Sequence, residues 1–200
     1  MIEHMHLHVT GFDANGNAAY VHSGEVQPIE VAFQAGTKFW LLWGTPDEGA
    51  LIGDAAVPVL APHFPSGHGT RFHIVRIPPR SAGQSFREGL STERMDELRR
   101  EAEDRLPGLF DVHAAADGTS AAHATDTVDY VTVLEGQLQL TLEGGEERGV
   151  SPGHFVVQRG TRHSWSNVRE DPATVVVITV AAQRERHGSA PALPGDETRT

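Results

Sequence analysis

Residues 123–167 read HATDTVDYVTVLEGQLQLTLEGGEERGVSPGHFVVQRGTRHSWSN, and this stretch decides the fold. It contains two alternating or β-branched runs, 130–134 and 137–142, with Gly136 at the turn between them. A further short strand is expected at 155–157, after Gly and Pro turn signals. Short strands joined by tight turns, without a helical period, indicate an all-β barrel or sandwich.

Histidine and carboxylate side chains mark the ends of these strands. His123, Thr125, Asp129 and Gly136 follow the spacing of the first signature motif of the cupin superfamily. That motif has a His-x-His, then a Glu, and a Gly six residues beyond the Glu. This chain resembles it with two departures: Thr125 replaces the second His, and Asp129 replaces the Glu.

The second cupin motif, Pro-x-Gly-x2-His-x3-Asn, is matched farther along the chain. Gln158, Gly160, His163 and Asn167 stand at the four positions, so Gln158 replaces the Pro. The two motifs occur in the family's order, and the resemblance covers roughly residues 121 to 182 in detail. It implies a jelly-roll barrel, that is, a double-stranded β-helix, with one metal site inside.

The resemblance assigns three residues to that metal site. Carried over position by position, the ligands are His123, Asp129 and His163, while Thr125 is a poor ligand. Asp126 is the reserve carboxylate, although strand alternation points it away from the interior if Thr125 faces inward. Imidazole and carboxylate donors suit Fe(II), Mn(II), Zn(II), Ni(II) or Cu(II), and this ligand number leaves positions open for a substrate or O2.

Each of these residues also has a purely structural interpretation. His163 is alternatively a hydrogen-bonded histidine at the barrel rim, and His123 a surface residue at the end of a linker. Asp129 is alternatively a strand-end carboxylate paired with Arg159 or Arg162.

A substrate pocket is expected beside the metal site. Tyr130, Trp165 and Gln158 are its candidate lining, although the aromatic side chains alternatively only pack. The resemblance implies a metal-dependent enzyme for a small molecule, with a dioxygenase acting on a small aromatic or oxygenated metabolite as the leading subclass. One motif ligand is missing, so a non-enzymatic ligand-binding or sensor cupin is the alternative. The same fold also hosts isomerases and dehydratases.

The length, charge and cysteine content of the chain limit the kinds of fold and binding partner that we expect. The 200 residues fit one domain with a sizeable core. A formal net charge of -11 argues against nucleic acid or an anionic membrane as a partner. The absence of cysteine excludes disulfides and thiolate metal sites. We find no signal peptide at the amino terminus and no apolar run long enough to span a bilayer, so a cytoplasmic protein is expected.

The amino terminus predicts a β-hairpin. Residues 2–9 alternate, placing His4, His6 and His8 on one face, and residues 13–16 (DANG) form a turn. Three histidines on one strand face are either a metal site or the solvent face of an edge strand.

The remaining elements follow from local patterns. Residues 38–43 (KFWLLW) predict a buried strand, 71–77 an alternating strand, and 175–180 a strand that closes the sheet. Between the first two, residues 44–70 are rich in Gly, Pro and Asp and predict a long loop over the barrel mouth. The single helix is expected from Ser91 or Thr92 to Pro107-Gly108.

These elements suggest three regions. Residues 1–110 form an extension with strands and one helix, 111–182 form the barrel core, and 183–200 form a disordered tail. The long extension further predicts a homodimer, in which its strands pack on the barrel of the other subunit.

Overall fold

The structure of the protein is a computed structural model that describes residues 2–50, 52, 57–79, 81–82, 90–114 and 122–185. The elements in these residues are β1 (Met5–Phe12), β2 (Ala18–Val26), β3 (Ile29–Glu30), η1 (Ala32–Gln34), β4 (Lys38–Thr45), β5 (Thr70–Ile77), α2 (Thr92–Arg105), β6 (His113–Ala114), β7 (His123–Ala124), β8 (Thr127–Glu135), β9 (Leu138–Leu142), β10 (Glu147–Val150), β11 (Phe155–Arg159), β12 (His163–Ser166) and β13 (Ala173–Ala181).

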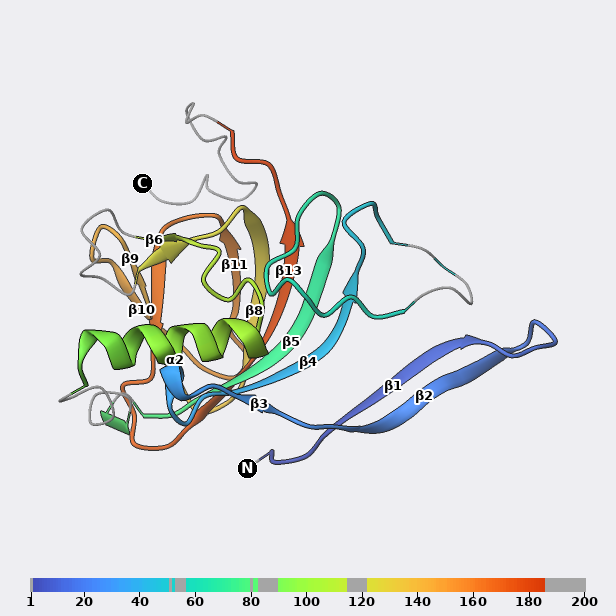
Figure 1. The fold of residues 1–200 in the computed structure, drawn as a ribbon, viewed down its shortest axis with the longest axis horizontal. Coiled ribbons are helices and arrows are strands. Elements are labelled where there is room, and N and C mark those ends of the chain that lie inside the picture. The colour runs from blue at the N-terminus through green and yellow to red at the C-terminus, as the bar shows by residue number, and fades with distance from the viewer. Residues whose placement is uncertain are drawn as a thin grey trace, which may run out of the picture.

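Two antiparallel sheets face each other (Figure 1). The larger has the strand order β11-β8-β13-β5-β4-β3, and the smaller has the order β10-β9-β12-β7-β6. From β8 onward the chain passes back and forth between the two sheets, which is the winding of a jelly roll. The predicted all-β jelly-roll fold is therefore confirmed, and α2 is the predicted helix. The larger sheet combines strands from both sides of residue 110, because β3, β4 and β5 pair alongside β13 and β8.

An apolar core fills one end of the space between the sheets. Its buried members come from β8, β9, β10 and β13 and are Val131, Val133, Leu138, Leu140, Val150, Ala173 and Val175. Gly136 makes the turn from β8 to β9 with φ 76°, and a Cβ there would lie 2.8 Å from the Pro172 carbonyl oxygen. The turn therefore requires glycine both for its conformation and for space.

Helix α2 covers β3 and β4. Ser91 caps its start, since the Ser91 Oγ accepts a hydrogen bond from the Arg94 N–H at 3.2 Å. The buried face of this helix is apolar: Ala102 and Leu106 pack with Phe39 of β4 in a second core cluster. No helix in the described part of the chain is long and apolar enough to cross a membrane.

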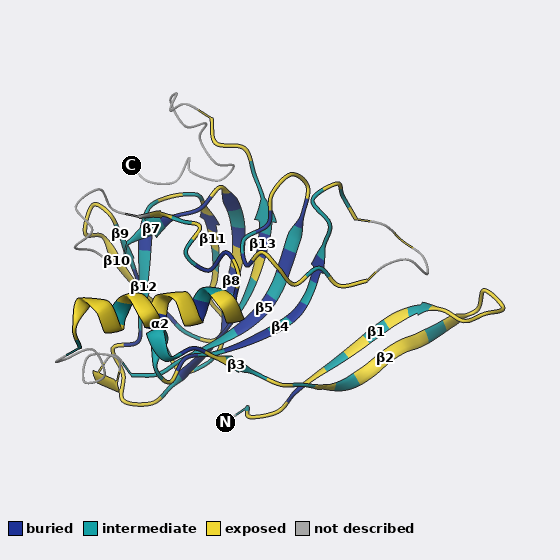
Figure 2. Ribbon diagram, viewed as in Figure 1, coloured by how far each residue is buried: buried dark blue, intermediate teal, exposed yellow. Residues whose placement is uncertain are grey.

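The predicted amino-terminal hairpin, β1–β2, projects from the barrel (Figure 1). His4, His6 and His8 lie on its solvent face, and Figure 2 shows much of this hairpin as exposed. His4 Nδ1 lies 2.6 Å from Glu25 Oε1. The strand is anchored at its start, where Met5 packs on the outer face of β4 and β5.

The described part of the predicted long loop, 44–70, forms a hydrogen bond to the segment that follows α2. The His63 N–H donates to the Pro107 carbonyl at 2.6 Å. Residues 51 and 53–56 of this loop lie outside the described residues.

The start of the predicted tail is docked on the barrel. Arg184 donates to Asp126 Oδ1 at 2.7 Å, to the Thr125 carbonyl at 2.8 Å and to the Gly160 carbonyl at 3.0 Å. The tail was predicted to be disordered over residues 183–200, of which 186–200 lie outside the described residues.

Candidate functional site

A row of polar side chains crosses the interior face of the larger sheet. Gln158, Asp129, Thr179 and Arg71 occupy matched register positions on the adjacent strands β11, β8, β13 and β5, and all four are buried. We call these four residues the polar row. On β8 the interior positions next to Asp129 toward the core are valines, because side chains of one face recur every second residue. The barrel interior is therefore apolar at one end and polar at the other.

Two histidines meet on the smaller sheet. His163 of β12 pairs with His123 of β7, and their ring centroids are 4.9 Å apart. His163 is buried, and its Nδ1 lies 2.9 Å from the Thr161 carbonyl oxygen. An Nδ1–H donated to this carbonyl leaves Nε2 as the nitrogen with a free lone pair. Two of the three predicted ligands are thus brought together.

The electrostatics favour a neutral His163. Burial lowers its pKa below the usual value for histidine, the Thr161 carbonyl acts in the opposite direction, and His123 adds to the lowering. Neutral imidazole is the form that binds a metal.

Asp129 is a buried carboxyl group with incomplete pairing. Burial raises its pKa above the usual value, while the hydroxyls of Thr127 and Thr179 act in the opposite direction. Its Oδ1 has no hydrogen-bond partner among the described residues. Asp129 forms no ion pair with Arg159 or Arg162 in the described structure. Arg162 instead pairs with Glu143.

The three predicted pocket residues lie in different surroundings. Gln158 Nε2 donates to the carbonyl of Thr161 at 3.2 Å, and this same carbonyl accepts from His163. Gln158 therefore links the polar row to the turn that holds His163. Trp165 lies on the same face of β12 as His163, with ring centroids 6.4 Å apart. Tyr130 is 51% exposed on the outer face of β8, opposite to Asp129, so it does not line the interior.

The donor set fits a metal ion in part. No group of three or more His, Cys, Asp or Glu side chains in the described ranges is close enough to hold one. His123 and His163 supply two imidazoles, and Asp129 is not grouped with them. The reserve carboxylate, Asp126, is half-exposed and pairs with His113 at 3.1 Å and with Arg184 at 2.7 Å.

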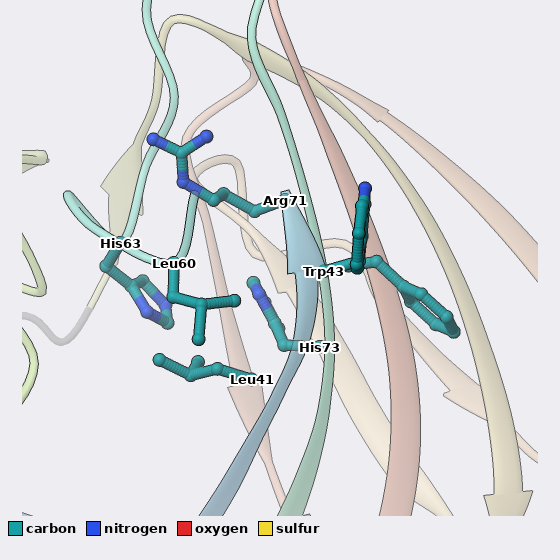
Figure 3. A pocket seen from close by; sticks show the side chains of 7 residues that line it. Leu41, Trp43, Leu60, His63, Arg71 and His73 are labelled. Carbon is teal, nitrogen blue, oxygen red and sulfur yellow. The ribbon is translucent and has the colours of Figure 1, made fainter. Parts of the chain in front are cut away.

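A second cluster was missed by sequence reasoning. The rings of His63 and His73 stack with centroids 4.8 Å apart and planes at 23°, beside the buried Arg71. They border a narrow pocket, too tight to hold a water molecule, which also touches Leu41 and Leu60 (Figure 3). The alternation of 71–77 did place Arg71 and His73 on one strand face, whereas His63 lies in a loop that carries no periodic signal.

Comparison with known proteins agrees with this architecture. The family described as "Cupin domain" matches residues 108–179. Together with the two motifs and the jelly roll, this match identifies residues 108–179 as a cupin domain.

Several fungal proteins resemble a shorter segment of the chain. Phomopsin biosynthesis cluster protein C' of Diaporthe leptostromiformis is 43% identical over 65 residues, covering 31% of this chain and 34% of that protein. Oryzines biosynthesis cluster protein J of Aspergillus oryzae is 53% identical over 45 residues, covering 22% and 25%. Cupin-domain-containing oxidoreductase fogC of Aspergillus ruber is 45% identical over 49 residues, covering 24% of each chain. The matches span about a third or less of these relatives.

Proposed function

We propose that this protein is a cupin-type oxidoreductase that binds a divalent transition metal at His123 and His163 and acts on a small molecule. The leading subclass is a dioxygenase acting on a small aromatic or oxygenated metabolite. The observation that carries the proposal is the pair of imidazoles 4.9 Å apart, one of them buried and held by a backbone carbonyl. The name of the fogC relative, an oxidoreductase, supports the reaction class.

Each residue of the proposed site would have a separate role. A bound Fe, Mn, Zn, Ni or Cu ion supplies open coordination positions for O2 or substrate. His123 and His163 would hold it, with Asp129 as the proposed third ligand, and the Thr161 carbonyl would fix the His163 ring. Trp165 would exclude water on the same face of β12 as His163.

The test is metal analysis of untagged protein, before and after addition of each of the five divalent ions. Wild type should bind one ion, His163→Ala and His123→Ala should lose most of it, and His8→Ala on the exposed hairpin should retain it. Protonation competes with binding, so occupancy should fall with pH. Because burial lowers the pKa of His163, the fall should lie below the usual histidine value of about 6.5. Absence of stoichiometric metal under all of these conditions would overturn the metal proposal.

Asp129 favours a second candidate. A carboxyl group with a raised pKa and an unpaired oxygen is suited to moving a proton, as in a cupin isomerase or dehydratase. A non-enzymatic ligand-binding or sensor cupin is the remaining alternative. Loss of turnover in Asp129→Asn with unchanged metal content would favour the proton-transfer role over ligation.

A further inference from the structure

Arg71 is a buried cation without full compensation. Its Nε donates to the Pro62 carbonyl at 2.8 Å, and Nη1 donates to the Thr70 and Thr45 carbonyls at 2.8 and 3.1 Å. All three acceptors are uncharged. Its ion-pair partner, Asp47, has a 38% exposed side chain and lies 4.0 Å from Nη2, which has no hydrogen-bond partner among the described residues. A buried charge is costly unless an opposite charge pairs with it.

His63 supplies a second unpaired polar atom in the same place. Its Nδ1 is buried and lacks a hydrogen-bond partner in the described part of the chain. Burial lowers the pKa of His63 to about 4, and it also lowers the pKa of His73 well below the usual value. Both rings are therefore neutral near pH 7, and each keeps one N–H to donate.

The pocket walls suit a small organic anion. Leu41 and Leu60 lie beside the two histidine rings, and Arg71 lies at one end of the group (Figure 3). The space between these side chains is too narrow to hold a water molecule. Occupation by a ligand therefore requires the loop that carries Leu60 and His63 to shift.

We propose that this pocket binds the carboxylate of a small-molecule ligand, with Arg71 Nη2 and the His63 ring N–H as donors. Guanidinium donors match the planar geometry of a carboxylate, and an apolar wall accommodates the rest of the molecule. Arg71 belongs to the polar row and lies two strands from Asp129, so a ligand held here would extend toward Asp129. That this ligand is the substrate rests on the proposed function, whereas its binding does not.

The direct test is binding of sodium acetate to the full chain, by calorimetry and by NMR of the His63 ring at pH 7. Acetamide is the neutral isostere, and sodium chloride at the same ionic strength controls for anions in general. We expect saturable acetate binding, with a shift of the His63 signals and at least tenfold weaker binding of acetamide. Equal binding of acetate and chloride would show an inorganic-anion site only and would overturn the carboxylate assignment.

Four variants test whether acetate binds at this pocket, and one of them should bind acetate more tightly than wild type does. Arg71→Gln and His63→Phe should weaken acetate binding at least tenfold and severalfold, respectively. Asp47→Asn removes the competing carboxylate and should tighten binding severalfold, a gain that misfolding cannot produce. Arg76→Gln, on the opposite face of the same strand, is the matched control. Unchanged affinity in Asp47→Asn together with unchanged affinity in His63→Phe would overturn the proposal.

A further variant separates this proposal from the proposed function. His163→Ala should lose metal and still bind acetate. If wild type binds acetate but neither binds metal nor turns over a substrate, the proposed enzyme function is refuted and the proposed carboxylate pocket stands. If wild type binds metal and turns over a substrate but does not bind acetate, the carboxylate pocket is refuted and the enzyme function stands.

Discussion

Replacing Asp129 by Asn should stabilise the metal-free protein at pH 7. The Asp129 carboxyl is buried, its Oδ1 is unpaired in the described structure, and its neutral form is favoured by burial. A buried polar atom without a partner costs about 1 to 3 kcal/mol, and a charge adds to this cost. The Asn amide also needs partners, so we expect a net gain of about 1 kcal/mol. For a chain of this length, that corresponds to a rise in Tm of about 2 to 4 °C.

The gain should depend on pH in a defined direction. A raised pKa means that folded protein holds this proton more tightly than unfolded protein does, so wild type loses stability as pH rises through the folded pKa of Asp129. The variant lacks this loss. Thermal unfolding followed by circular dichroism in EDTA should therefore show almost no gain below about pH 4, near the usual pKa of Asp, and a gain that grows as the pH rises from there to 7.

Asp126→Asn is the matched control with the opposite sign. Hydrogen bonds from His113 and Arg184 lower the pKa of Asp126, so its carboxylate contributes stability above the usual Asp pKa and loses it as pH falls through the folded value. The group is half-exposed, so the variant should lose less than about 1 kcal/mol at pH 7. An equal gain for Asp129→Asn at pH 4 and pH 7, or a loss at pH 7, would refute the argument from charge burial.

Three further predictions concern the rest of the molecule. The chain ending at residue 185 should melt within about 1 °C of wild type, whereas the chain ending at 182 should melt lower because it lacks the Arg184 contacts; equal melting would refute the anchoring role. Leu106→Ala should cost about 2 to 5 kcal/mol in denaturant unfolding, since this side chain is buried between α2 and β4, and a cost below about 1 kcal/mol would contradict that packing. The protein should sediment as a homodimer at micromolar concentration and become monomeric or aggregate without the β1–β2 hairpin; a wild-type monomer in analytical ultracentrifugation would exclude this assembly.

The strands and the helix could be predicted because their signals are local. Side chains of a strand alternate between two faces, so Asp129 lies on the same interior face of β8 as the valines at 131 and 133. The same rule places Tyr130 outside, which the prediction of a pocket role for Tyr130 did not take into account. Ser91 and Pro107-Gly108 likewise predicted the two ends of α2.

Only the tertiary structure decided which polar side chains share the barrel interior. His123 and His163 are forty residues apart in the sequence, and their pairing was expected only because the two motifs resemble a known family. The cluster of His63, His73 and Arg71 depends on the fold of a loop without periodic signal, which brings His63 onto His73 of β5. Alternation determines the face on which a side chain lies, but strand order and loop path determine its neighbours, and both depend on contacts between distant parts of the chain.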